Sequence, residues 1–482
     1  MSAPALWTAA EVAAATGGRS TGAWTATGVS IDSRSLAPGD LFFALAGPTF
    51  DGHDFARAAL DAGAAAAVVA RIPAALEDAR ALVTVDDTLD ALELLGAAGR
   101  ARARARVVGV TGSVGKTGTK EMCAATLAAF GTVHASPGSY NNQVGVPLTL
   151  ARLAPATGFA VIEMGMNHTG EIAALTRIAR PHVAIITGIE AVHLEFFAGL
   201  HRIAQAKAEI FDCIPAPAAA VLNRDNACFR QLAQAARRAG VERVIGFGAL
   251  PDCEVRLVDY AAAPGDNRIE AEVDGRALAY TLGADGRHWA LNSLAALAAV
   301  HALGRDVEAA AARLAGVATP PGRGARTTLA LAGGRRVILV DDAYNASPAS
   351  MRAAFEALAA IPVPRGGRRL AVLGDMLELG AESERLHAAL ALDIERANID
   401  VVITVGSFMA ALNDALPAAR RGPHAGSPEA VAELLPEVLH DGDVLLVKGS
   451  HASAMYRLVD ALRRLDTSGA TNPSRCAAAV EG

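Results

Sequence analysis

Apolar residues in this chain gather in short runs that alternate with helical segments. The first such series predicts strands over 40–45 and 66–69 with a helix over 55–62 between them. A further helix is expected over 88–106. Strands that alternate with helices are typical of α/β folds, whose sheets are mostly parallel.

The pattern restarts at Val107, where the apolar run VVGVT leads into a glycine loop and a helical segment over 116–130. Between 254 and 282 the period changes to strict alternation, and Asp274-Gly275 separates two β-rich runs. Such a pair predicts a two-residue hairpin, and therefore an antiparallel insert. Further strands of this series are expected over 159–162, 183–187 and 219–222.

A third α/β series follows Pro320-Pro321-Gly322, a stretch typical of a linker. It predicts a Rossmann-like sheet, and ligands then lie beyond the carboxyl ends of the strands. The strands are expected over 337–340, 370–373, 401–405 and 444–447. The predicted domains are a small N-terminal α/β domain (1–103), a central P-loop-type α/β ATPase with the antiparallel insert (104–319), a C-terminal α/β domain (320–465) and a disordered tail (466–482).

The composition narrows the class of protein. The chain of 482 residues is 52% hydrophobic with a net charge of −6, which suits a globular protein and gives no basic field for nucleic acid. We expect no membrane insertion, because no apolar run reaches about 18 residues. The start lacks a basic leader pattern, and the five cysteines show no C-x-x-C pair. A cytoplasmic monomer is the expectation.

Lysine is scarce, with four among 44 basic residues. Arginine stays charged, whereas a buried lysine can lose its proton, so the lysines that remain point to chemistry. Lys116, Lys207 and Lys448 lie in motifs, whereas Lys120 could equally be incidental. The arginines at 100, 102, 104 and 106 are expected to form a solvated face.

The glycine loop TGSVGKTGTK predicts a phosphate site, because its backbone N–H groups and the following helix can hold an anion. Lys116 would reach the β- and γ-phosphates and Thr117 would bind Mg²⁺. The usual spacing is not met, since Val110 replaces the first glycine, and an incidental turn is the alternative. The expected ATP contacts in the loop are Thr111, Gly112, Ser113, Val114, Gly115, Lys116 and Thr117.

Three more residues lie where a metal site could form. Glu163 ends an apolar strand and could hold Mg²⁺, although capping is the alternative. His193 lies in a loop after a strand and could be a ligand or a structural residue. Lys207 lies on a helix, where burial would lower its pKa and permit reaction with CO₂, unless it is a surface lysine.

Polar residues also follow three strands of the third series, and together they predict a substrate site. Each could instead be ordinary turn chemistry, with Asp and Ser acting as helix caps. The candidates are Asp341, Asp342, Tyr344, Asn345, Ser347, Asp375 and Lys448.

Several motifs together resemble the Mur ligase family over about residues 25–465: TGSVGKT, SYNNQVGVPLTL, EMGMNHTGEI, AKAEIF, DDAYNASP and GDMLELG. The resemblance implies three domains, of which the first binds a uridine-diphosphate sugar. It implies that Glu163 and His193 bind magnesium and that carbamylated Lys207 bridges to a second magnesium. It places Asp32, Ser33, Arg34, Asp51, Gly52 and His53 at the uridine-diphosphate sugar, and His288, Asn292, Arg323 and Asp341 at ATP.

The last two motifs imply the family branch whose ATP-dependent reaction joins D-alanyl-D-alanine to UDP-N-acetylmuramoyl-tripeptide through an acyl phosphate. The alternatives are the sibling ligase that adds the third amino acid and a non-catalytic nucleotide-dependent binding protein. Gly118 and Trp289 depart from the family pattern, which often has threonine and asparagine there. The sequence does not indicate the third amino acid of the peptide.

Overall fold

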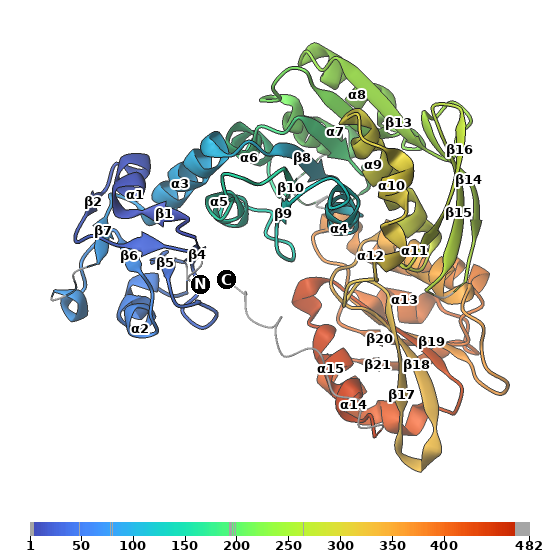
Figure 1. Cartoon of the computed structure of the whole chain (residues 1–482). Coiled ribbons are helices and arrows are strands. Elements are labelled where there is room, and N and C mark those ends of the chain that lie inside the picture. The colour runs from blue at the N-terminus through green and yellow to red at the C-terminus, as the bar shows by residue number, and fades with distance from the viewer. Residues whose placement is uncertain are drawn as a thin grey trace.

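The computed structural model describes residues 4–467 except 48, 78, 80, 192–194, 196, 198 and 264. Three α/β units follow one another along this part of the chain (Figure 1). The predicted fold class is confirmed. Most of the predicted tail lies outside the described residues, but Asp466 and Thr467 pair with Ala330 at the edge of the C-terminal sheet.

The N-terminal unit is built on a five-stranded sheet in the order β2-β7-β6-β5-β4, parallel except for β2. The predicted strand over 66–69 is observed as β6, and the helix predicted over 88–106 ends at Arg102. Its elements are β1 (Trp7–Thr8), α1 (Ala9–Thr16), β2 (Arg19–Ser20), β3 (Thr25–Ala26), β4 (Gly28–Ser30), β5 (Asp40–Phe43), the 3-10 helix η1 (Gly52–Phe55), α2 (Ala56–Asp61), β6 (Ala66–Val69), β7 (Leu82–Thr84) and α3 (Thr88–Arg102).

The central unit is built on a nine-stranded sheet in the order β16-β15-β14-β13-β12-β11-β8-β10-β9. Strands β8 to β14 pair in parallel, and β14, β15 and β16 form the predicted antiparallel insert. Its elements are β8 (Arg106–Thr111), α4 (Lys116–Leu127), β9 (Val133–Ala135), α5 (Gly145–Ala151), β10 (Phe159–Glu163), α6 (Glu171–Ala179), β11 (Val183–Ile186), α7 (Leu200–Ala208), β12 (Ala219–Asn223), α8 (Phe229–Arg238), β13 (Arg243–Gly248), β14 (Val255–Ala261), β15 (Asn267–Val273), β16 (Arg276–Leu282), α9 (Arg287–Ala302) and α10 (Val307–Ala311).

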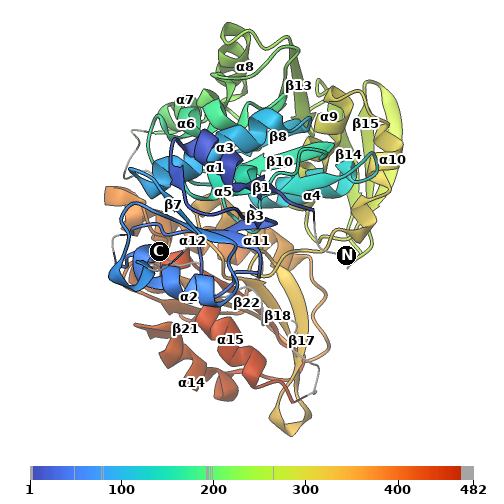
Figure 2. The same cartoon turned by 60° about the vertical axis from the view of Figure 1, so that its left-hand side comes forward.

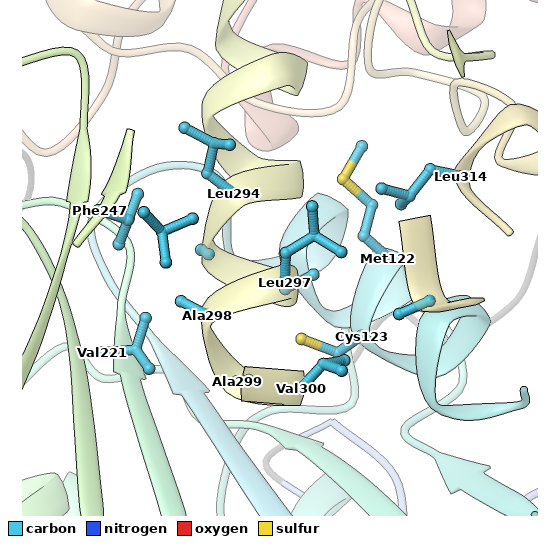
Figure 3. Close-up of a cluster of buried hydrophobic side chains, with 14 of the residues drawn as sticks. Met122, Cys123, Val221, Phe247, Leu294, Leu297, Ala298, Ala299, Val300 and Leu314 are labelled. Carbon is cyan, nitrogen blue, oxygen red and sulfur yellow. The ribbon is translucent and has the colours of Figure 1, made fainter. Parts of the chain in front are cut away.

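Helices cover both faces of this sheet. On one face α4, α9 and α10 pack into a core that includes Met122, Leu294 and Leu297 (Figure 3). On the other face α5, α6, α7 and α8 pack against the opposite side chains of the same strands. The predicted hairpin turn is confirmed, because Asp274 and Gly275 both have positive φ, at 47° and 75°.

The C-terminal unit has a six-stranded sheet in the order β17-β18-β22-β19-β20-β21, parallel except for β17. The predicted strand over 401–405 is observed without a shift. Its elements are β17 (Ala325–Ala330), β18 (Arg336–Asp342), α11 (Pro348–Ala359), β19 (Arg369–Gly374), α12 (Ser383–Arg396), β20 (Val401–Val405), α13 (Met409–Ala415), β21 (Arg421–Ala425), α14 (Pro428–Val438), β22 (Val444–Lys448) and α15 (Tyr456–Arg464).

Helix α3 joins the first two units and corrects one prediction. Arg100 is buried and donates from Nε to the carbonyl of Ala179 at 2.8 Å, and burial lowers its pKa to about 10. The guanidinium of Arg102 lies 3.4 Å from the centre of the Trp7 ring. The solvated arginine face is therefore wrong at these two positions, because α3 runs from the N-terminal unit to the central unit (Figure 1; Figure 2 shows the same cartoon turned by 60°). Arg104 alone of the four is exposed.

Within the described residues, no helix is long and apolar enough to cross a bilayer.

Candidate functional site

The phosphate loop lies between β8 and α4, as predicted. Gly115 adopts a left-handed conformation with φ of 84° immediately before α4. Among the described residues, no side chain caps the first N–H groups of α4. These donors, together with the positive end of the helix, suit a phosphate group. A Cβ at Gly112 would collide with the hydroxyl of Thr187, so only glycine allows the loop this close to β11.

Lys116 lies over the loop. Its Nζ donates to the carbonyl of Gly112 at 2.9 Å. Burial lowers the pKa of Lys116, the nearby Glu163 carboxylate opposes this shift, and Arg323 adds to it. Residues from the central and C-terminal units therefore act on the same ammonium group.

A chain of polar contacts joins the phosphate loop to the C-terminal unit. Thr117 Oγ1 lies 3.3 Å from Ser139 Oγ, and Arg323 Nη2 donates to Ser139 Oγ at 3.2 Å. The Arg323 guanidinium lies 4.1 Å from the centre of the Tyr344 ring. Ser139 begins the motif SYNNQVGVPLTL, but no feature of the neighbouring sequence marks it as a partner of Thr117.

Glu163 ends β10 and is buried. Its Oε1 accepts a hydrogen bond from Asn141 Nδ2 at 2.8 Å. Its Oε2 is buried and has no hydrogen-bond partner in the part of the chain that the structure describes. An open carboxylate oxygen and the Thr117 hydroxyl are hard ligands that suit Mg²⁺. His193, the other predicted ligand, lies outside the described residues.

Lys207 is buried on α7, with 1% of the residue exposed, so the surface alternative is wrong. Burial lowers its pKa well below the ordinary value, and the positive charge of Lys116 lowers it further. A neutral amine is the reactive form of lysine. The burial of Lys207 therefore favours its neutral amine.

Lys120 is buried too, but its surroundings differ. Its Nζ donates to the carbonyls of Ser136 at 2.6 Å and Gly138 at 2.8 Å, and it pairs with Glu121 at 2.7 Å. Lys120 therefore holds the segment that precedes Ser139. It is neither incidental nor placed to react.

At the edge of the C-terminal sheet, Asp341 and Asp342 are held by cations. Asp341 Oδ2 accepts from Arg463 Nη2 at 2.9 Å and from the backbone N–H of Gly322 at 3.1 Å. Asp342 pairs with Lys448 at 2.7 Å, although burial raises its pKa. Lys448 Nζ also donates to the carbonyl of Asn345 at 2.9 Å. Arg463 lies in α15, 122 positions after Asp341, and belongs to no motif. The sequence therefore could not identify it as the partner of Asp341.

Two predicted substrate residues act as caps. Ser347 accepts from the backbone N–H of Ser350 at 3.3 Å and begins α11. Asp375 Oδ1 accepts from the backbone N–H of Met409 at 2.8 Å, at the start of α13. Both side chains therefore cap helices, which is the alternative to substrate binding that the sequence left open.

His288 and Asn292 lie near the start of α9, beside the phosphate loop. Burial, and after it the positive charge of Lys448, lower the pKa of His288 to about 4, so the ring is neutral at pH 7. Asn292 Oδ1 would lie 2.7 Å from a Cβ at Gly115. A cleft here is lined by Asp285, His288, Arg323, Arg326 and Asp342, among others.

The predicted uridine-diphosphate site lies in the N-terminal unit, apart from these residues (Figure 1). Asp32 follows β4 and accepts from Arg34 Nε at 2.9 Å and Nη2 at 2.8 Å. The Arg34 side chain is 67% exposed, and Ser33 is partly exposed between them. This turn therefore presents an arginine to solvent.

The second N-terminal turn is closed on itself. The buried His53 ring lies 2.6 Å from Asp51 through Nδ1, and its Nε2 accepts from the backbone N–H of Ala70 at 2.9 Å. The backbone N–H and ring of His53, with Arg71, lower the pKa of Asp51 to about 2. A Cβ at Gly52 would lie 2.7 Å from the backbone nitrogen of Leu45. Gly52 and His53 thus shape the turn.

With this geometry described, comparison with known proteins gives the family. Residues 25–101, 110–300 and 326–451 match the Mur ligase family catalytic domain, the Mur ligase middle domain and the Mur ligase glutamate ligase domain. The UDP-N-acetylmuramoyl-tripeptide--D-alanyl-D-alanine ligase of Escherichia coli is 37% identical over 92% of this chain and 95% of its own. The chain belongs to the Mur ligase family.

Solved Mur ligases share the whole fold. A MurF structure from Acinetobacter baumannii has a TM-score of 0.82 at 29% identity and covers 95% of this chain and 99% of its own. The MurF ligase of Thermotoga maritima in complex with ADP has a TM-score of 0.74 at 30% identity, with 91% and 97% covered. The predicted resemblance to this branch of the family is confirmed.

Proposed function

We propose that this Mur ligase joins D-alanyl-D-alanine to UDP-N-acetylmuramoyl-tripeptide at the expense of ATP, in the cytoplasm and as a monomer. The observation that carries the proposal is the meeting of Lys116 and Glu163 of the central unit with Arg323 of the C-terminal unit at one phosphate loop. The names of the relatives support the choice of substrates.

The reaction begins with activation of a carboxylate, because a free carboxylate is a poor electrophile. An oxygen of the terminal carboxylate attacks the γ-phosphorus of ATP, the bond to the β-phosphate bridging oxygen breaks, and ADP leaves. Lys116 and the N–H groups of α4 stabilise the negative charge on the transferring phosphoryl group. Arg323 approaches the same charge from the C-terminal unit.

The dipeptide amine then attacks the carbonyl carbon of the acyl phosphate. The tetrahedral intermediate loses phosphate with the carbon–oxygen electron pair, and the amine loses a proton, which leaves an amide. Asp342, Tyr344, Asn345 and Lys448 lie at the edge of the sheet that faces this step. We assign the dipeptide and the ATP ribose to this edge, with Asp341 near the ribose.

Glu163, Thr117 and His193 would hold magnesium. Magnesium neutralises phosphate charge and orients the γ-phosphoryl group. The open Glu163 oxygen supports this assignment. Glu163 and Thr117 keep their own partners, Asn141 and Ser139, which fix the directions of the two oxygen ligands.

Lys207 would carry a carbamate. Its neutral amine would add to CO₂, with formation of a carbon–nitrogen bond and release of one proton, so a neutral side chain would become an anionic oxygen donor that could hold a second magnesium. The lowered pKa and the burial of Lys207 support this step. An arginine at this position could not react in the same way.

The N-terminal turn at Asp32, Ser33 and Arg34 would bind the uridine-diphosphate end of the substrate. The planar guanidinium of Arg34 suits a diphosphate. Asp51, Gly52 and His53 would contribute through the shape of the neighbouring turn.

The deciding assay measures ADP release by the purified chain with UDP-N-acetylmuramoyl-tripeptide, with and without D-alanyl-D-alanine. We expect release that depends on the dipeptide, with a matching amount of amide product. Turnover with the dipeptide-stage UDP precursor and a free diamino acid would instead support the sibling ligase. ATP binding without any turnover would support the non-catalytic alternative.

A further inference from the structure

Gly118 and Trp289, the two departures from the family pattern, lie against each other. An ideal Cβ at Gly118 would lie 2.6 Å from Cζ3 and 3.0 Å from Cη2 of Trp289. Nonbonded carbon atoms prefer separations of about 3.5–4.0 Å. The indole of Trp289 therefore occupies the space that a side chain at position 118 would need.

Gly118 is the third residue of α4, where glycine is a poor helix former. Its φ is not among the positive values found at other glycines of the chain, so backbone freedom does not explain it. A glycine inside a helix then points to close packing. The small size of Gly118 is what this position requires.

Trp289 acts through its volume. The residue is 3% exposed and belongs to the core cluster formed by α4 and α9. Its Nε1 is buried and has no hydrogen-bond partner among the residues that the structure describes. Buried indole N–H groups usually find a partner, so packing holds this ring in place.

The same contact sets the distance between α9 and the phosphate loop. Asn292, on α9, has Nδ2 at 3.3 Å from the Cβ position of Gly118 and Oδ1 at 2.7 Å from that of Gly115. His288 directly precedes Trp289, with ring centres 5.8 Å apart. A shift of the indole would therefore move His288 and Asn292, the two residues of α9 that the proposed function places at ATP.

We propose that Gly118 and Trp289 form one complementary pair that spaces α9 from the phosphate loop, and that Trp289 is a positioning residue for His288 and Asn292. The inference rests on the proposed use of ATP at this loop. On this account the small residue Gly118 on α4 and the large residue Trp289 on α9 compensate for each other in volume.

The test is a double-mutant cycle in the full-length chain, read as the KM for ATP at saturating levels of the other substrates. We expect Gly118→Thr to raise this KM about tenfold, because overpacking displaces the indole. We expect Trp289→Asn to raise it about fivefold through the cavity it leaves. The double variant should return to within about threefold of the parent, since the two volume changes offset each other.

Two further variants separate volume from other effects. Trp289→Phe keeps an aromatic ring but removes the unpartnered N–H and part of the outer ring edge that meets Gly118, so its KM should rise by only about two- to threefold, less than in Trp289→Asn. Gly316→Thr is the matched control, because a Cβ there meets nothing within 4 Å. If Gly118→Thr does not fold, Gly118→Ala adds the colliding atom alone.

Multiplicative effects in the double variant, or a loss in Trp289→Phe as large as in Trp289→Asn, would overturn the inference. An unchanged KM in Gly118→Thr with normal thermal stability would do the same. Calorimetric titration of ATP without the other substrates gives an independent readout. An enzyme that bound ATP with this coupling but showed no dipeptide-dependent turnover would contradict the proposed function and leave the inference standing.

Discussion

The phosphate loop and the N-terminal turn at Asp32, Ser33 and Arg34 differ in how far their ionisable side chains are exposed. Around the loop, Glu163 and Lys207 are almost fully buried, and burial lowers the pKa of Lys116 and Lys207. At the N-terminal turn, Arg34 stays 67% exposed beside Asp32. The ionisable groups Glu163 and Lys207 near the loop are therefore shielded from solvent, whereas the turn presents its arginine to solvent.

From this difference we expect the phosphate loop to serve catalysis and the N-terminal turn to serve substrate binding. Buried, oriented charges cost stability to maintain but interact strongly with charge that develops during a reaction. An exposed arginine interacts weakly until a ligand covers it. Changes at the loop should therefore lower kcat, and changes at the turn should raise the KM for the UDP substrate.

The largest effect is expected for Lys207→Ala. We expect turnover to fall by at least about 10³-fold, because the variant cannot form the proposed carbamate that would hold magnesium. Added formate or acetate should restore part of the activity by supplying a carboxylate in the space left by the side chain. Steady-state ADP release at several carboxylate concentrations measures this.

Lys120→Ala is the matched control, because Lys120 is also buried but holds backbone carbonyls. Its loss should lower thermal stability without any rescue by carboxylates. Full activity of Lys207→Ala, or equal rescue of both variants, would rule out the carbamate at Lys207.

Glu163→Gln should have the next largest effect. The amide keeps the size of the side chain but removes the charge of the open oxygen, so we expect kcat to fall by about 10²-fold. The magnesium concentration for half-maximal activity should rise as well. An unchanged magnesium titration would show that Glu163 has no part in holding the metal.

Arg34→Ala tests the other side of the comparison. We expect the KM for UDP-N-acetylmuramoyl-tripeptide to rise about tenfold with kcat nearly unchanged, because the proposed contact of the arginine with the diphosphate lies far from the reacting bond. Arg57→Ala, which removes an exposed arginine paired with Asp61, serves as the control and should leave KM unchanged. A fall in kcat alone for Arg34→Ala would contradict the assignment of substrate binding to the N-terminal turn and catalysis to the phosphate loop.

The smallest expected effect concerns pH. The pKa of Lys207 lies well below its ordinary value, so the neutral fraction of the amine increases as pH rises through the lowered pKa. After removal of CO₂, reactivation at a fixed dissolved CO₂ concentration should therefore be no slower at pH 8 than at pH 6, and the increase should stay below the roughly 100-fold expected for a lysine with the ordinary pKa of about 10.4. Reactivation that is slower at the higher pH would have the wrong sign.

Local features of the fold could be predicted from the sequence. The strands at Ala66–Val69 and Val401–Val405, the hairpin at Asp274-Gly275 and the phosphate loop depend on short-range patterns, and the structure has each of them. Helix ends were less accurate, since α3 ends at Arg102 where its prediction continued to 106.

Long-range contacts could not be predicted. Arg323 donates to Ser139, the partner of Thr117, across 184 positions of the chain, and Arg463 reaches Asp341 from the last helix. Burial of Arg100 depends on how α3 crosses to the central unit. Such contacts leave no periodic signal, because they follow from the arrangement of the units in space.

The central claim is that the phosphate loop activates a carboxylate as an acyl phosphate. It is tested most directly with UDP-N-acetylmuramoyl-tripeptide labelled with ¹⁸O in both oxygens of its terminal carboxylate, incubated with ATP and D-alanyl-D-alanine. Mass spectrometry should find one ¹⁸O atom in each released phosphate and the other in the new amide. Unlabelled phosphate released alongside ADP would contradict the claim, because it would show that water, not the carboxylate, had accepted the phosphoryl group.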